Sequence, residues 1–138
     1  MKNSTQQIIK NGLKESIEIK SKILDSNLII QIENASASIV KCLQEGKKIF
    51  FAGNGGSFAD SQHLAAEFIS RFLFNRSALP AVALGTNSSS MSAISNDYNY
   101  KDVFSRELEA LASNKDIFIP ISTSGNSTNL IEELRQPK

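Results

Sequence analysis

The sequence is poor in the residues that build covalent cross-links or metal clusters. Its 138 residues include one cysteine, Cys42, and one histidine, His63. A single cysteine excludes an intrachain disulfide and a thiolate metal cluster, and its helical spacing with Ile39 and Leu43 predicts a small core residue. A chain of this length can bury a hydrophobic core without such cross-links, so we expect a single domain.

An excess of one charge and long apolar runs are also missing. Fifteen basic and fourteen acidic residues give a net charge of +1, which gives no reason to expect nucleic acid or an anionic membrane as a partner. No apolar run is long enough to span a membrane, and residues 1–12 lack the apolar segment of a signal peptide. The sequence therefore predicts a cytoplasmic protein that binds neither nucleic acid nor membrane.

Two amphipathic helices are predicted at the N-terminal end. Apolar residues recur at helical spacing over residues 4–24 and again, after the break Asp25-Ser26-Asn27, up to Gly46. Two such helices carry more apolar surface than a small sheet can cover. The first helix is either an oligomerisation arm or part of the core of one subunit, and the pattern alone leaves both open.

The remaining residues, 47–138, alternate strand and helix signals. Apolar runs predict strands at residues 49–52, 81–84 and 116–121, each followed by a turn of small polar residues. We expect four helices: one after the turn at residues 53–56, one from Met91, one over residues 101–112 and one from Thr128. The third is expected to carry Val103, Phe104, Leu108 and Leu111 on one face. Residues 72–77 are expected to form a loop, and Asn96-Asp97-Tyr98 a turn.

This alternation predicts an α/β fold with a parallel sheet and helices on both of its faces. Right-handed crossovers place all three polar turns at the carboxyl edge of the sheet, which is where open α/β sheets bind ligands. We therefore expect one domain in which helices over residues 1–46 precede a partial α/β core over residues 47–138.

The first strand leads into a glycine-rich turn, Gly53-Asn54-Gly55-Gly56, and then into a helix. Free N–H groups at such a helix start can bind an anion. Farther along the same helix, His63 and Glu67 are four residues apart and so share one face. A phosphate site beside an imidazole and a carboxylate indicates proton transfer on a small phosphorylated substrate. A ligand-free turn and an ordinary surface histidine are the alternatives.

The third strand leads into six residues with four hydroxyls and one glycine, STSGNS at residues 122–127. Hydroxyls and backbone N–H groups together can hold a phosphate without a cationic side chain. The alternative is a serine-rich loop in which Ser127 or Thr128 only caps the following helix.

Three collinear motifs carry a resemblance to a known family. They read GNGGSFADSQHLAAEFISRF, ISNDYNYKDVFSRELEA and ISTSGNSTNLIEEL. Together they resemble the phosphoheptose isomerases of the sugar-isomerase (SIS) domain family. The resemblance implies a tetramer whose N-terminal helices pack between subunits. It also implies conversion of sedoheptulose 7-phosphate to D-glycero-D-manno-heptose 7-phosphate, which supplies heptose for lipopolysaccharide or capsule.

The resemblance also implies roles for individual residues. Glu67 matches the catalytic glutamate, and His63 with Glu67 matches half of a zinc site. Two ligands are too few for tight zinc binding on their own. The positions that match substrate contacts are Asn54, Gly55, Gly56, Ser57, Arg71, Asn96, Asp97, Ser122, Thr123, Ser124 and Ser127. Taken alone, Asp97 would be a turn former and Arg71 a solvated or ion-paired side chain.

The sequence departs from the family pattern in two respects. Members continue beyond the position of Lys138 with further strands and a last helix that supplies a glutamine and a second histidine. We therefore expect little isomerase activity from these 138 residues, and a non-catalytic SIS module that binds a sugar phosphate or a protein partner is the alternative. Glu67 favours the isomerase, because a binding module has no need of it.

The second departure is that Pro120 and Asn99 replace residues that are usually glycine in the family. Proline is poorly tolerated inside a central parallel strand.

Overall fold

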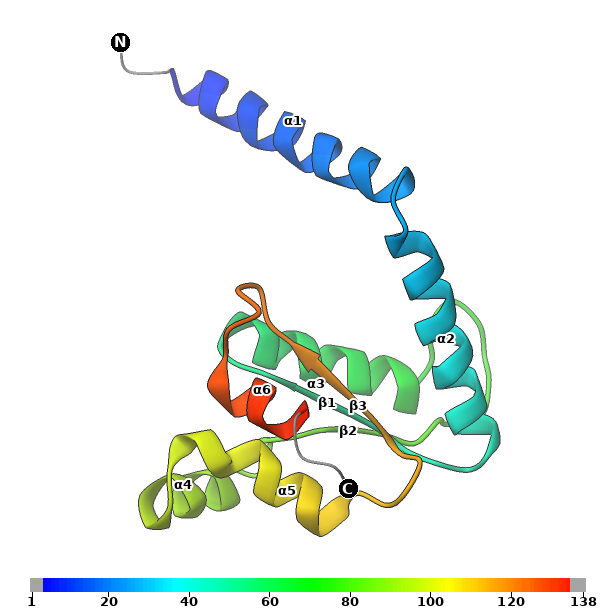
Figure 1. The fold of residues 1–138 in the computed structure, drawn as a ribbon, viewed down its shortest axis with the longest axis vertical. Coiled ribbons are helices and arrows are strands. Elements are labelled where there is room, and N and C mark those ends of the chain that lie inside the picture. The colour runs from blue at the N-terminus through cyan, green and yellow to red at the C-terminus, as the bar shows by residue number, and fades with distance from the viewer. Residues whose placement is uncertain (1–3, 135–138) are drawn as a thin grey trace. The chain divides into compact units, whose positions relative to one another are not determined.

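The computed structural model describes residues 4–134. Along the chain the elements are α1 (Thr5–Leu24), α2 (Leu28–Gln44), β1 (Ile49–Gly53), α3 (Gly56–Ile69), β2 (Ala81–Ala83), α4 (Ser88–Asp97), the 3₁₀ turn η1 (Tyr100–Asp102), α5 (Val103–Leu111), β3 (Ile117–Ile121) and α6 (Thr128–Leu134) (Figure 1). The chain divides into two compact units inside α2, between Ser38 and Ile39.

The first unit consists of α1 and the first part of α2. Ser4 caps α1, since its Oγ accepts a hydrogen bond from the Gln7 N–H. The break between the helices is closed by Ser26, whose hydroxyl donates to the Ile23 carbonyl and accepts from the Leu28 N–H. No described residue of α1 is buried. The predicted pair of helices is confirmed, and its apolar stripe is exposed in the single chain.

The second unit is built on a parallel sheet with the strand order β2-β1-β3. Ile49 is the partner of Ala81 on one side and of Ile117 on the other, and all five residues of β1 are buried. Because both neighbours run parallel to β1, the turns that follow the three strands lie at the same edge of the sheet. The predicted parallel α/β fold is confirmed.

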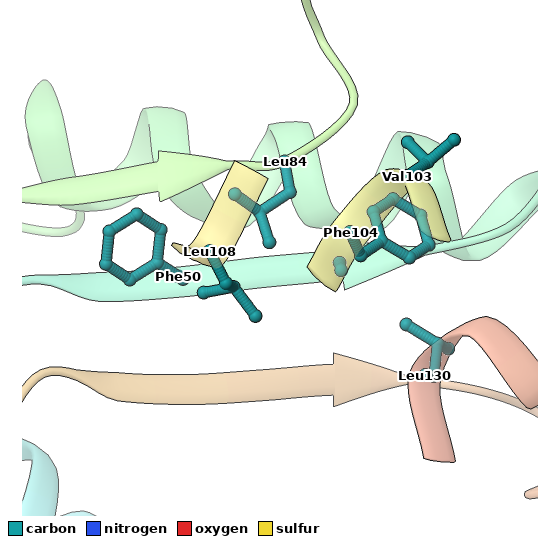
Figure 2. Close-up of a cluster of buried hydrophobic side chains, with 7 residues drawn as sticks. Phe50, Leu84, Val103, Phe104, Leu108 and Leu130 are labelled. Atoms are coloured by element: carbon teal, nitrogen blue, oxygen red, sulfur yellow. The ribbon is translucent and has the colours of Figure 1, made fainter. Parts of the chain in front are cut away.

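Side chains alternate across β1 and so define two hydrophobic layers. Phe50 and Ala52 pack with Leu84 and with residues of α5 and α6 (Figure 2). Ile49 and Phe51 pack on the opposite face with the end of α2 and with Ala65 of α3. The predicted helices on both faces are therefore present. Cys42 belongs to the second layer, with 5% of its surface exposed, as its spacing predicted.

Two predicted details of the region after β2 are wrong. The helix α4 begins at Ser88 and not at Met91, because Asn87 caps it by accepting hydrogen bonds from the Ser89 and Ser90 N–H groups. Asn96 and Asp97 then form the last turn of α4, and not a separate turn. In α5, Val103, Phe104 and Leu108 are buried as predicted, but Leu111 at the helix end is half exposed.

Pro120 lies inside β3, opposite Ala52 of β1. Within residues 4–134, β3 pairs with β1 alone and forms an edge of the sheet. An edge strand tolerates proline because one of its sides needs no ladder donor.

Among residues 4–134, no helix is both long enough and apolar enough to cross a membrane.

Candidate functional site

The glycine-rich turn after β1 needs two of its glycines for steric reasons. A Cβ on Gly53 would collide with the backbone of Ser57, and Gly55 has φ of 55°, a left-handed conformation that favours glycine. The Ser57 and Phe58 N–H groups close the turn on the carbonyls of Asn54 and Gly55. Among the described residues, the Gly55 and Gly56 N–H groups find no acceptor, which leaves them available to an anion.

The hydroxyl loop, residues 122–127, follows β3 and lies beside this turn because Gly53 and Ile121 are register partners. The Ser122 hydroxyl is central to it, at 3.4 Å from Ser124 Oγ and 3.2 Å from Ser127 Oγ. Two N–H groups of the loop are folded inward, with Gly125 donating to Ser122 Oγ and Asn126 to Ser124 Oγ. The loop thus presents three adjacent hydroxyls, while Thr123 is exposed.

The alternative for this loop was that a hydroxyl only caps the next helix. Ser127 does begin α6, since its carbonyl accepts from the Leu130 and Ile131 N–H groups. Its hydroxyl, however, pairs with Ser122 Oγ and with no N–H group in the described part of α6. The hydroxyl therefore faces its own loop.

A cluster of uncharged side chains joins the turn to the hydroxyl loop. Asn54 and Asn129 exchange two hydrogen bonds of 2.9 and 3.0 Å, and the Tyr100 hydroxyl donates to Asn54 Oδ1 at 3.0 Å. The Asn54 side chain, expected to contact substrate, is therefore largely occupied within the protein. Ser57, in the first turn of α3, is buried.

His63 and Glu67 lie together on α3, as their spacing predicted. His63 Nε2 is 3.8 Å from Glu67 Oε1, and the side chains are 75% and 31% exposed. Glu67 follows Gly56 by eleven residues, which places it about 16 Å along the helix axis. The backbone of Glu67 is thus remote from the turn, and a ligand that contacts both must be extended.

The end of α3 is held by an arginine that sequence analysis did not single out. Arg76 donates to the backbone carbonyls of Glu67, Phe68 and Ser77 at 2.7 to 2.9 Å. A guanidinium that binds the last carbonyls of a helix stabilises that helix end. Arg76 therefore fixes the backbone that carries Glu67 without touching its carboxylate.

Three expected substrate contacts make no hydrogen bond to these loops within the described part of the single chain. Asn96 donates to Asp97 Oδ1 at 2.8 Å, and both side chains are exposed on α4 beside an open hollow of about 530 Å³. Arg71 follows α3 and is also exposed. A second hollow, of about 460 Å³, lies between β2, α4 and α5, away from the turn and the hydroxyl loop.

His63 and Glu67 have the chemistry and spacing of two ligands for a divalent metal. Within residues 4–134, however, no group of three or more histidine, cysteine, aspartate or glutamate residues is placed to hold one. Tetrahedral zinc sites need three or four ligands. The described residues therefore fit half of a zinc site.

Asn129, Tyr100 and Arg76 escaped prediction for a shared reason. Each acts through hydrogen bonds to a segment far away in the sequence or to main-chain carbonyls, and neither kind of contact leaves a periodic pattern. The one available signal was Asn129, a polar residue directly before the apolar pair Leu130 and Ile131, at a position that proves to be buried. A buried amide is expected to have a specific partner.

Comparison with known proteins relates this chain to one family. A sequence profile of the SIS domain matches residues 13–138. The phosphoheptose isomerase of Aneurinibacillus thermoaerophilus is 49% identical over 131 residues, covering 94% of this chain and 66% of that protein. The phosphoheptose isomerase of Clostridium acetobutylicum is 47% identical over 134 residues, covering 96% and 68%.

The fold is also that of a solved structure. The phosphoheptose isomerase from Neisseria gonorrhoeae superposes with a TM-score of 0.84 at 38% identity, covering 96% of this chain and 68% of that one. The chain thus spans about two thirds of the length of the relatives it matches.

Proposed function

Since this chain belongs to the SIS-domain family, and within it to the phosphoheptose isomerases, we propose that it acts in aldose–ketose isomerisation of a phosphorylated seven-carbon sugar. The substrate is sedoheptulose 7-phosphate and the product is D-glycero-D-manno-heptose 7-phosphate. The observation that carries the proposal is the row of hydroxyls at Ser122, Ser124 and Ser127 beside the glycine-rich turn.

The separation along α3 between the glycine-rich turn and Glu67 suits an extended substrate. A chain of three backbone bonds spans about 3.5 Å, so the eight bonds from C1 of a heptose 7-phosphate to phosphorus span about 9 Å. The reach of the protein side chains and the lengths of the hydrogen bonds at the two ends of the substrate add to this span. The total is roughly the 16 Å between Gly56 and Glu67. A three-carbon phosphate would be too short to contact both.

The chemistry needs one proton to move between adjacent carbons. In this proposal Glu67 removes a proton from C1 of the ketose, which gives an ene-diol, and then returns a proton to C2. The proton on O1 is lost as the aldehyde forms, and O2 gains one, so no atom enters or leaves overall. Arg76 holds the backbone from which Glu67 projects.

The test of this role is proton exchange at C1. NMR in D₂O follows deuterium entering C1 of sedoheptulose 7-phosphate, a half-reaction that begins when the base removes the C1 proton. Glu67→Gln keeps the shape and removes the base, so exchange should fall by about 10²–10⁴-fold. Glu109→Gln, an exposed glutamate of α5, is the control and should exchange as the original does. Equal exchange by Glu67→Gln would remove Glu67 from the reaction.

Zinc binding belongs to the same proposal, with His63 and Glu67 as the two ligands that this chain supplies. A zinc ion would polarise the sugar carbonyl and hydroxyl oxygens. Titration with a competing zinc indicator should show weaker binding in His63→Ala than in Gln62→Ala, an exposed neighbour on α3. Equal zinc affinity in both variants would exclude His63 as a ligand.

We further propose that the chain assembles as a homotetramer through its N-terminal helices. The support is the exposed apolar stripe of α1, which includes Ile9, Leu13 and Ile17. Exposed apolar surface of this extent marks an interaction site in most proteins.

We also propose that the protein works in the cytoplasm and supplies heptose for lipopolysaccharide or capsule. A free, buried cysteine suits a reducing compartment. Deleting the gene should remove heptose from the surface polysaccharide by sugar analysis, and cell fractionation should recover the protein with soluble enzymes. An unchanged heptose content of the polysaccharide would contradict the proposed pathway. Recovery of the protein outside the cytoplasmic fraction would contradict the proposed location.

A further inference from the structure

Three segments that leave the sheet at different strands meet at Asn54, Asn129 and Tyr100, a cluster that we call the amide joint. Asn54 Nδ2 donates to Asn129 Oδ1, and Asn129 Nδ2 donates back to Asn54 Oδ1. Two amides that exchange bonds in this way form a closed ring. Neither amide can rotate without breaking both hydrogen bonds.

Tyr100 adds a third hydrogen bond to the ring. Its hydroxyl donates to Asn54 Oδ1, which therefore accepts from two donors. Turning Asn54 over alone would set its Nδ2 against Asn129 Nδ2, donor against donor. Tyr100 lies in η1, so the joint also secures the segment between α4 and α5.

Burial makes the joint costly to open. Asn129 is 5% exposed, and a buried amide that loses its partner keeps the full cost of its lost hydration. The joint is therefore expected to stay closed in the folded protein. Burial also keeps Asn129 away from any bound ligand, so its influence on binding must be indirect.

The joint connects the two loops that the proposed function assigns to phosphate. Asn54 stands between Gly53 and Gly55 in the turn, and Asn129 follows Ser127 of the hydroxyl loop by two residues. A phosphate that bonds to both loops can do so only at one separation between them. The β1–β3 register also helps to set this separation.

We propose that Asn129 and Tyr100 are positioning residues, which hold the glycine-rich turn and the hydroxyl loop at the distance where one phosphate group contacts both. This inference rests on the proposed function, because it requires the phosphate site. Under this proposal, phosphate binding depends on two further residues, Asn129 and Tyr100, neither of which contacts the substrate.

The test is an NMR titration of the full 138-residue chain with inorganic phosphate. In the original chain the amide signals of Gly55 and Gly56 should shift together with those of Gly125 and Asn126, with one common Kd. Asn129→Leu keeps the size and adds no charge, but removes both hydrogen bonds between Asn129 and Asn54 and leaves Asn54 with Tyr100 alone as its partner in the joint. It should weaken phosphate binding about tenfold, and the two sets of signals should no longer share a Kd.

Tyr100→Phe removes one hydroxyl from a half-exposed residue and so keeps the test valid if Asn129→Leu does not fold. It should weaken phosphate binding about threefold. The matched control is Tyr98→Phe, since Tyr98 packs its ring 4.1 Å from the Arg106 guanidinium and has no part in the joint. Asn75→Leu, in an exposed loop, is the control for Asn129→Leu.

The outcomes separate the two proposals. If the original chain shows no phosphate shifts in either loop, the phosphate site is wrong and the joint has nothing to position. If the original chain binds phosphate and each folded joint variant keeps one unchanged Kd, the positioning role alone is overturned. A loss in Tyr98→Phe equal to that in Tyr100→Phe would also overturn it.

Discussion

At the scale of single residues, the proposed phosphate site depends on three of the four hydroxyls of the hydroxyl loop, those of Ser122, Ser124 and Ser127. Replacing both Ser124 and Ser127 by alanine leaves Ser122 with the Gly125 N–H as its remaining hydrogen-bond partner in the loop. The double variant should bind sedoheptulose 7-phosphate more weakly by roughly 1–3 kcal/mol, since two charge-assisted hydrogen bonds are lost. Titration calorimetry measures the change.

The control for that double variant is Ser36→Ala with Ser38→Ala. These exposed serines of α2 donate only to carbonyls of their own helix. Their loss should leave affinity unchanged. An affinity in Ser124→Ala/Ser127→Ala equal to that of this control would remove the loop from the site.

Sequence patterns predicted the residues of the two loops better than their contacts. The order strand, small polar turn, helix placed Gly53 to Ser57 and Ser122 to Ser127 at one sheet edge, and the β1–β3 pairing confirms that neighbourhood. The partners of Asn54 could not be predicted, because Asn129 lies 75 residues away. Only the folded chain brings the two amides together.

At the scale of elements, the start of β3 is secured by a buried carboxylate. Asp116, with a side chain 3% exposed, accepts hydrogen bonds from the N–H groups of Lys48 and Ser113 and pairs with the Lys48 ammonium. Burial by itself raises the pKa of Asp116, but these hydrogen bonds and the Lys48 charge outweigh it and lower the pKa below its usual value.

This lowered pKa gives a pH-dependent contribution to stability. A carboxyl that is more acidic in the folded state stabilises it above the unfolded pKa of about 3.9, and this stabilisation is lost as pH falls through the lower folded pKa. Asp116→Asn should therefore lower the free energy of unfolding by about 1–3 kcal/mol at pH 7. The difference from the original chain should shrink below about pH 4.

Urea unfolding followed by circular dichroism at pH 7 and in acid measures both effects. Asp60→Asn, an exposed aspartate of α3, is the control and should stay within about 0.5 kcal/mol of the original chain. A deficit in Asp116→Asn that is as large in acid as at pH 7 would show that the charge is not the cause.

The elements themselves were largely predictable, and the errors have local causes. Strong apolar runs predicted the bounds of β1 and β3 to within one residue. Five buried or half-buried positions in a row leave little alternative to a strand that is covered on both faces. The start of α4 was missed because a run of serines is typical of a loop. Asn87 converts that run into a capped helix start.

At the scale of the whole molecule, the described residues of α1 gain no stability from burial within the single chain. It is twenty residues long, none of its described residues is buried, and Ile9, Leu13 and Ile17 are each more than half exposed. In proteins, most of the stability of a helix comes from packing of its amphipathic face and not from the intrinsic helix propensity of its residues. A helix with such a stripe is expected to gain its stability from packing against another chain.

The stripe can be tested by charging it. Ile9→Lys with Leu13→Lys puts two ammonium groups on the apolar face, four residues apart, and desolvating them in an interface is costly. Sedimentation velocity at micromolar concentration should show a homo-oligomer, most simply a tetramer, for the original chain and a smaller species for this variant. The control is Gln7→Lys with Asn11→Lys, which adds the same charge at two residues that hydrogen-bond to each other on the polar face. This control should sediment as the original chain does, and an original chain that sediments as a stable, folded monomer would refute the assembly.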